Sequence, residues 1–181
     1  MDVANDTSEN ARVLEQELTW FRQVLEARFK AYFGDSPSAE NIFAIAPPDL
    51  SESASQYAGL VRRHALCFAE RLALVLALIP HLRPQLLDVF FTRNTAIDRR
   101  FTEFGGGPAK TEGEFLPTGE TLAFLLGGND LACRFTVQAL LAPEGRLARH
   151  SLLRLNPQPG EDGPILKTPL AIPEDLLCLL A

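Results

Sequence analysis

The chain begins with apolar residues spaced as on one face of an α-helix. From Leu14 onwards they recur every three or four residues, which is the period of an amphipathic helix. Asp6 and Glu9 have the spacing of a capping pair at its start, and Gly34 is suited to end it. We therefore predict a helix within residues 1–34 with one apolar stripe. The stripe comprises Leu14, Leu18, Phe21 and Leu25, and it continues through Arg28 or Phe29 to Tyr32.

This stripe allows two interpretations. The helix can pack against the rest of its own chain, or it can present the stripe to a partner or to a neighbouring subunit. The stripe is shorter than the three or four heptads that indicate a coiled coil. Both interpretations stay open at the level of sequence, and the first four residues of the stripe are candidate partner-binding residues.

A second long helix is predicted after a proline-containing loop. Residues 35–49 hold three prolines and form the predicted linker. Asp49 and Glu52 again have the spacing of a capping pair, and residues 65–79 are nearly all apolar. A helix that is apolar around most of its girth is buried on most sides. We expect one central helix over about residues 50–79.

Two short helices joined by a tight turn are predicted between residues 115 and 142. Residues 127–129, Gly-Gly-Asn, supply the turn, because glycine and asparagine tolerate the backbone angles that turns require. The whole segment holds three charged side chains, which are Glu120, Asp130 and Arg134. The pattern predicts a helix-turn-helix that carries very little positive charge.

The flanking elements complete the order of a winged helix. A short helix is expected at about residues 83–91, and a short strand at residues 101–104, before the two helices. Two strands at residues 152–155 and 165–170 follow them, with an acidic, proline-rich tip between. The predicted fold class is mainly α, a winged helix-turn-helix with a small β-hairpin wing plus two long N-terminal helices. Residues 50–181 would form the winged-helix-type domain.

Composition narrows the class of protein. The chain has 181 residues and a net charge of −6, and this length can bury a core without disulfides or a metal. A negative chain disfavours non-specific binding to nucleic acid or to anionic membranes. The longest apolar run, at residues 72–80, is too short to span a bilayer, and the first residues are polar rather than a signal peptide. We predict a cytoplasmic protein with no membrane partner.

The cysteines do not indicate a disulfide framework or a zinc site. Cys67, Cys133 and Cys178 are odd in number and widely spaced, with no CxxC pair. Each lies in an apolar stretch, so we predict buried thiols that behave as small apolar side chains.

No catalytic motif stands out in the sequence. The run at residues 105–111 looks like a phosphate-binding loop, but Ala109 stands where the motif needs glycine, directly before Lys110. The histidines are scattered, and the sequence holds no HExxH or GxSxG motif and no paired-carboxylate cluster. We predict no catalytic residue, no cofactor site and no metal site in this chain.

A helix-turn-helix raises the hypothesis of DNA binding, in which the second helix reads the groove. Its polar stripe is Asp130, Arg134 and Gln138, and we expect Asp130 to pair with Arg134. Specific DNA binding needs about six or more phosphate contacts, so this stripe favours a protein partner over nucleic acid. The alternative is a winged-helix DNA-binding regulator with an N-terminal dimerisation helix. Further candidate contact residues near the wing are Arg146, Arg149 and Arg154.

Four segments of the chain resemble a known family. They are residues 83–91 (RPQLLDVFF), 101–106 (FTEFGG), 115–121 (FLPTGET) and 169–174 (PLAIPE). Together they look like the N-terminal winged-helix region of a bacterial AAA+ ATPase family, some of whose members accompany phage-tail-like contractile injection systems. The resemblance extends from about Leu72 to the end of the chain.

The resemblance implies a regulatory or substrate-recruiting domain rather than an enzyme. In this family a catalytic AAA+ module, which binds ATP and Mg²⁺, would follow residue 181. Walker A and Walker B motifs are absent from residues 1–181, so no ATP-binding residue is carried over. The expected function is a non-catalytic interaction domain. Its expected partners are a protein client, neighbouring subunits or its own ATPase module, with a homo-oligomer formed through the full-length protein.

Overall fold

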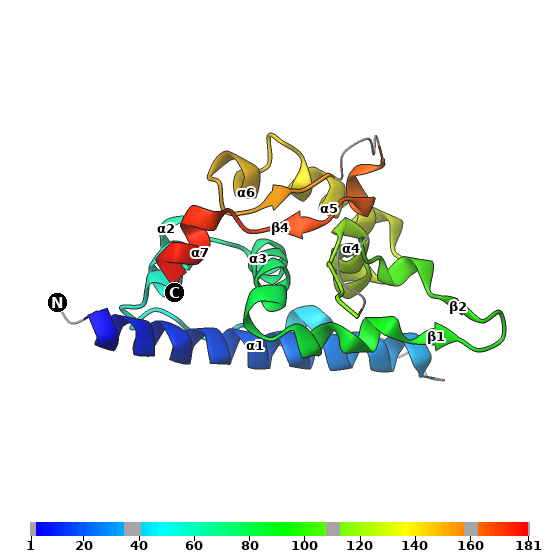
Figure 1. Ribbon diagram of the computed structural model, residues 1–181, viewed down its shortest axis with the longest axis horizontal. Helices are drawn as coiled ribbons and strands as arrows, with labels where there is room; N and C mark the ends of the chain where they lie inside the picture. The colour runs from blue at the N-terminus through cyan, green and yellow to red at the C-terminus, as the bar shows by residue number, and fades with distance from the viewer. Residues whose placement is uncertain (1–2, 35–40, 108–112, 158–162, 181) are drawn as a thin grey trace. The chain divides into compact units, whose positions relative to one another are not determined.

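The protein is described by a computed structural model that covers residues 3–34, 41–107, 113–157 and 163–180. It is mainly helical, with small antiparallel strand pairs, which confirms the predicted class at this coarse level. The chain divides into two compact units (Figure 1). Unit 1 comprises Met1–Val75 and Pro173–Ala181, and unit 2 comprises Leu76–Ile172.

Unit 1 is built on the long N-terminal helix. Its α1 contacts η1 and α2, and α2 contacts α7. The first helix ends where predicted, just before Gly34. It begins at Val3, so Asp6 lies inside the helix and not at its start, as the predicted capping pair required. The elements of unit 1 are α1 (Val3–Phe33), η1 (Ile42–Ala44), α2 (Gln56–Arg63), the first half of α3 (Phe68–Leu82) and α7 (Glu174–Leu180).

The single helix predicted over residues 50–79 is wrong, because this segment forms two helices. Ser55 caps the start of α2, since its hydroxyl accepts a hydrogen bond from the Ala58 amide at 3.1 Å. The chain then breaks at Ala65, whose φ of 44° lies in the left-handed region. Residues other than glycine rarely adopt that conformation, and alanine carries no sequence signal for it. Asp49 accepts a hydrogen bond from the Ser51 amide at 2.9 Å in a turn, away from any helix start.

The prediction that residues 72–79 belong to a helix buried on most sides is confirmed by α3. Every residue from Leu72 to Ile79 is at most 1% exposed, as expected for a helix that is apolar around most of its girth. Pro80 lies inside α3 near its end. No single described helix is long and apolar enough to cross a membrane, and α3 with η2 reaches that length only as a pair bent by 103°.

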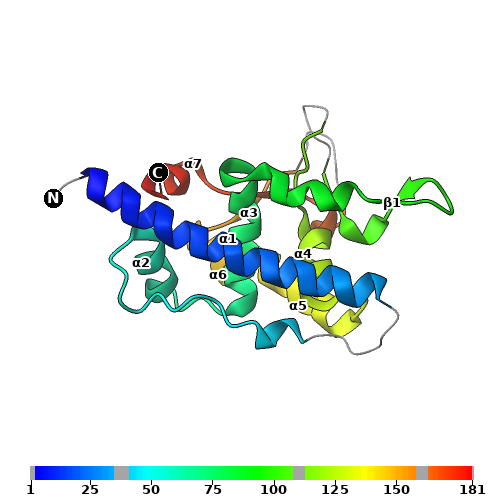
Figure 2. The ribbon, with the colours of Figure 1, turned by 90° about the horizontal axis from the view of Figure 1, so that it is seen from below.

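Unit 2 contains the predicted helix-turn-helix, α4 followed by α5, which lie side by side (Figures 1 and 2). Its hairpin β1–β2 extends beyond the other elements of the unit in both views. The elements of unit 2 are the second half of α3, η2 (Pro84–Phe91), β1 (Arg93–Asn94), β2 (Arg99–Arg100), η3 (Thr102–Phe104), α4 (Gly119–Gly127), α5 (Leu131–Leu141), α6 (Arg146–Arg149), β3 (Arg154–Leu155), η4 (Ile165–Lys167) and β4 (Leu170–Ala171).

The strands differ from the prediction in place and length. Residues 101–104 do not form a strand, because Thr102–Phe104 is a 3-10 turn, and the pairing lies just before it, between β1 and β2. The two later strands are present but short. β3 pairs antiparallel with β4, with Leu155 opposite Leu170. The first half of the segment predicted as the second of these strands is the 3-10 helix η4.

Four phenylalanines form the apolar centre of unit 2. The rings of Phe90 and Phe115 stack with centroids 5.0 Å apart, and those of Phe104 and Phe124 lie 4.7 Å apart. Phe90 also meets Phe104 edge-on at 5.9 Å. All four side chains are buried. Aromatic pairs in these geometries add stability beyond the area that they bury, so this cluster ties η2, η3 and α4 together.

Candidate functional site

The start of α4 is fixed by hydrogen bonds to the segment before it. The Thr118 amide donates to the Thr121 hydroxyl at 3.1 Å, and that hydroxyl donates to the Phe104 carbonyl at 2.9 Å. A Cβ on Gly119 would come within 2.8 Å of the Leu166 Cα, so α4 and η4 approach closely at a residue without a side chain. The helix-turn-helix is therefore anchored to both η3 and η4.

The predicted ion pair between Asp130 and Arg134 is wrong. Asp130 caps α5, and its carboxylate accepts a hydrogen bond from the Ala132 amide at 2.9 Å, which is the usual role of aspartate at this position. Arg134 instead donates to both carboxylate oxygens of Glu120 on α4, with Nη1 and Oε2 2.6 Å apart. Hydrogen bonding to Glu120 raises the pKa of Arg134. The only cation of α5 is thus paired with a neighbouring helix.

The outward side of α5 is mostly apolar, and its exposed polar residue is Thr136, whose hydroxyl donates to the Ala132 carbonyl at 3.0 Å. Leu131 is 67% exposed and Phe135 is 63% exposed, and their spacing of four places them on one face of the helix. Ala132 and Ala139 are exposed as well. We call these four residues the exposed face of α5. Gln138, which the sequence placed in a polar stripe, is half-buried beside this face.

The remaining candidate cations lie on other elements. Arg146 and Arg149 belong to α6, and Arg154 belongs to β3. All three side chains are exposed. Because none of the three lies on α5, they place no positive charge on the helix that would read a DNA groove.

The N-terminal stripe is occupied by packing. Leu14, Leu18, Phe21 and Leu25 are all buried. Side chains with so little exposure offer no surface to a partner. Of the two interpretations of this helix, the structure favours packing over docking.

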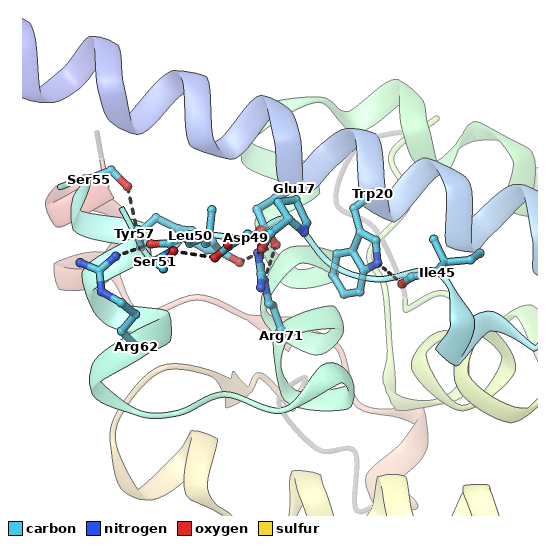
Figure 3. A network of polar contacts seen from close by, with 12 residues as sticks. Glu17, Trp20, Ile45, Asp49, Leu50, Ser51, Ser55, Tyr57, Arg62 and Arg71 are labelled. Carbon is cyan, nitrogen blue, oxygen red and sulfur yellow. Dashed lines mark hydrogen bonds and ion pairs between the residues drawn. The ribbon is translucent and has the colours of Figure 1, made fainter. Parts of the chain in front are cut away.

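A buried polar network joins three helices of unit 1 (Figure 3). Arg71 on α3 donates to Glu17 on α1, with Nε and Oε2 3.0 Å apart, and the Tyr57 hydroxyl on α2 donates to Glu17 at 3.1 Å. Arg71 also donates to the Pro48 carbonyl at 2.8 Å. Burial raises the pKa of Tyr57, and the Glu17 charge raises it further. Burial opposes the charge of Arg71, but its hydrogen bonds to Glu17 raise its pKa overall.

Trp20 extends this network along α1. Its indole N–H donates to the Ile45 carbonyl at 2.9 Å (Figure 3), and its ring meets Phe68 edge-on at 5.1 Å. The Arg71 guanidinium carbon lies 5.8 Å from the Trp20 ring centroid, within the range of a cation–π contact. The network therefore attaches both α3 and the loop before α2 to α1.

Sequence reasoning missed this network, although a signal was present. Glu17 lies three residues after Leu14 and four before Phe21, which places a carboxylate inside the apolar stripe. Charged residues are almost never fully buried unless they are paired. A glutamate in that position therefore calls for a cationic partner, which is Arg71 in the apolar α3.

A cleft of about 920 Å³ lies within unit 2. It is lined by the chain from Arg100 to Gly107 apart from Phe104, by Thr118 and Glu120 at the start of α4, by Arg134, and by residues around η4. Gly105 and Gly106 have φ values of 67° and 98°, which residues with side chains rarely adopt. The start of the run that looks like a phosphate-binding loop, residues 105–107, thus lines a cleft. Residues 108–111 of that run lie outside the described residues.

The cysteines are not buried as predicted. Cys67 and Cys178 are exposed and Cys133 is half-buried, and none of the three forms a disulfide. Cys67 lies between α2 and α3, where the predicted continuous helix is broken. Across the part of the chain that the structure describes, no group of three histidine, cysteine, aspartate or glutamate side chains is placed to hold a metal ion.

Comparisons with known proteins add no relative. No family of proteins, no curated protein and no solved structure matches this chain.

Proposed function

We propose that this chain is a non-catalytic interaction domain, the N-terminal domain of an AAA+ ATPase, which binds protein clients or neighbouring subunits. Unit 2 is its winged-helix-type part, with α5 in the position of the recognition helix and β3–β4 in the position of the wing. The partner is expected to contact the exposed face of α5.

The observation that carries this proposal is the chemistry of α5. A groove-reading helix needs cations and hydrogen-bonding side chains on its outer side. Here the outer side shows Leu131 and Phe135, and the only arginine is paired with Glu120. Single exposed apolar residues are ordinary, whereas adjoining ones on one face are typical of a protein-binding surface.

The segments that carry the family resemblance support a scaffolding role. The FTEFGG and FLPTGET segments are joined where Thr121 donates to the Phe104 carbonyl at 2.9 Å. The FLPTGET and PLAIPE segments are joined where the Leu170 amide donates to the Pro117 carbonyl at 2.8 Å. These contacts hold α4 and β4 in place, which is a structural role for the segments that carry the resemblance.

A substitution on the exposed face of α5 tests the proposal. Partners that co-purify with the full-length protein from its own cells would be compared for wild type and Phe135→Glu. Ile97→Glu is the matched control, because Ile97 is 62% exposed but stands alone at the turn of the β1–β2 hairpin. We expect at least one protein to be lost with Phe135→Glu and kept with Ile97→Glu. Identical sets of partners from all three forms would contradict the proposal.

The DNA-binding alternative makes a different prediction. It requires duplex binding that weakens with salt and that falls on Arg134→Ala or Arg149→Ala. Fluorescence anisotropy with mixed-sequence duplexes at low salt distinguishes the two. We expect no change in anisotropy over the titration, and a salt-dependent, arginine-dependent rise would establish the alternative instead.

The ATPase part of the proposal concerns the full-length protein. Residues 1–181 should neither bind nor hydrolyse ATP, which isothermal titration and a phosphate-release assay would measure. The coding sequence after residue 181 should contain a Walker A motif within roughly a hundred residues. A turnover of ATP by residues 1–181, or a continuation without that motif, would contradict this assignment.

A further inference from the structure

The cleft of unit 2 carries positive charge that the described residues do not neutralise. Arg100 on β2 and Lys167 on η4 both line it, and neither has a carboxylate partner in the described parts of the chain. The two cations come from segments more than 60 residues apart, as their numbers show, and the fold brings both to one cleft. Both side chains are exposed, so their charge is available to a ligand.

Arg100 faces a residue of like charge across the hairpin. Arg93 lies directly opposite Arg100 in the β1–β2 register, and like charges in that position repel. Arg93 is held by Asp98, with Nη2 and Oδ1 3.2 Å apart. Arg100 lies over the ring of Phe91, whose centroid is 4.8 Å from the guanidinium carbon. A cation over an aromatic face keeps its charge and its outward donors.

The cleft is also partly acidic, which limits the kind of anion that it accepts. Glu103 and Glu120 contribute to its lining. Glu120 is already paired with Arg134. A ligand with dense negative charge, such as a polyphosphate, would meet these carboxylates, whereas one with a single carboxylate or separated carboxylates can reach the cations and avoid them.

The size and the backbone of the cleft fit an extended chain. About 920 Å³ is at the upper end of ligand pockets, which hold roughly 300–1,000 Å³. The lining includes three successive glycines, Gly105 to Gly107. The amides of Gly105 and Gly107 donate to the carbonyls of Thr102 and Leu116, whereas Gly106 is exposed and its amide donates to no backbone carbonyl of the described residues. Exposed backbone of this kind can pair with the main chain of a peptide.

We propose that this cleft binds an extended peptide segment with an acidic side chain, whose carboxylate contacts Arg100 and Lys167. The inference rests on the proposed function in that it names the chemistry of a protein partner, but it concerns a surface other than the exposed face of α5. The segment would belong to a client or to a neighbouring subunit.

A selection from random peptides tests this inference. The purified protein would be used to select octapeptides from a displayed random library, and the affinities of selected peptides would be measured by fluorescence anisotropy. We expect enrichment of aspartate or glutamate, and roughly tenfold weaker binding when these are replaced by asparagine or glutamine. Absence of binders, or binders that do not depend on an acidic residue, would overturn the inference.

Charge-reversal variants locate the binding. Arg100→Glu and Lys167→Glu should each weaken the selected peptides roughly tenfold, whereas Arg99→Glu should leave them unchanged, because Arg99 is equally exposed on β2 but does not line the cleft. Circular dichroism would confirm that each variant is folded. Equal effects from all three variants would show non-specific attraction and overturn the site. If peptide binding fails while partner capture still depends on Phe135, the cleft is rejected and the proposed function stands.

Discussion

The two units each join two helices by an arginine–glutamate pair, but the pairs lie in different surroundings. In unit 1 the side chains of Glu17 and Arg71 are 1% and 8% exposed. In unit 2 those of Glu120 and Arg134 are 13% and 39% exposed. Desolvation makes a buried pair costly to form and costlier to break, whereas solvent screens a half-exposed one. The same chemistry therefore holds the core of unit 1 but mainly sets the surface charge of α5 in unit 2.

The cores of the two units also differ in the chemical groups that they bury. Unit 2 is centred on phenylalanines, and its buried polar side chains are the uncharged Thr118 and Thr121 among the described residues. Unit 1 instead places a carboxylate and a guanidinium inside, together with a tyrosine hydroxyl. All tryptophan and tyrosine residues, Trp20, Tyr32 and Tyr57, belong to unit 1. Tryptophan fluorescence therefore reports directly on the unit with the polar core.

Breaking the buried pair should have the largest effect. Arg71→Ala leaves the Glu17 carboxylate buried without its partner, so the free energy of unfolding should fall by about 3–5 kcal/mol. Urea unfolding followed by Trp20 fluorescence measures this. The double variant Glu17→Leu, Arg71→Met should recover only part of the loss. An apolar pair carries no desolvation cost, but the buried Tyr57 hydroxyl then lacks its acceptor. A loss below about 1 kcal/mol in the single variant would show that the pair behaves as a surface one.

Trimming the aromatic cluster should have an intermediate effect. Phe104→Leu keeps an apolar side chain of similar size in the centre of unit 2, so we expect a loss of about 1.5 kcal/mol, below the 3–5 kcal/mol of a phenylalanine-to-alanine change. Urea unfolding followed by circular dichroism gives the value. Phe135→Leu is the control and should stay within about 0.5 kcal/mol, because that side chain is exposed. Similar losses for both variants would argue against the cluster.

Breaking the half-exposed pair should have a small effect that depends on salt. Arg134→Ala should cost about 0.5–1 kcal/mol in dilute buffer, since the arginine is largely screened by solvent. At 1 M NaCl the Debye length is about 3 Å, and the difference should nearly vanish. The loss in Arg71→Ala should persist in the same salt. A salt-independent cost for Arg134→Ala would place this pair in the same class as the buried one.

The smallest effect concerns an exposed carboxylate of unit 1. Glu9 has a pKa of about 2, lowered from 4.5 chiefly by a hydrogen bond from Arg12 and also by one from Ser53. Because the folded pKa lies below the unfolded one, Glu9 stabilises the fold above about pH 4.5 and loses that contribution as the pH falls towards 2. Carbon-detected NMR should place its titration near pH 2, and Glu9→Gln should flatten the stability profile in this window. Titration near 4.5 would contradict the contact.

The sequence predicted those elements whose signals are local. Gly127 ends α4, Gly128 and Asn129 form the turn after it, and α4 and α5 lie where the pattern predicted them. The break between α2 and α3 was missed, because Ala65 adopts a left-handed conformation without being glycine or asparagine. Local spacing cannot show such a break when the tertiary structure imposes it.

At the candidate site, local spacing also failed to predict the partner of Arg134. Asp130, four residues before it, is the natural choice on a helix, but Asp130 is used to cap α5 and Glu120 takes its place from α4. The pairing depends on how α4 and α5 pack, which the spacing within one helix does not contain. The apolar outer face of α5 is likewise visible only once the buried side of the helix is known.

Photo-crosslinking from α5 tests the central claim, that its exposed face binds a protein. The photoreactive residue p-benzoyl-phenylalanine would replace Phe135 in the full-length protein, and Ile97 in the control, before irradiation in cells that produce it. We predict a discrete protein adduct from position 135 that is absent from position 97. Adducts to nucleic acid at position 135, equal adducts from both positions, or no adduct would contradict the claim.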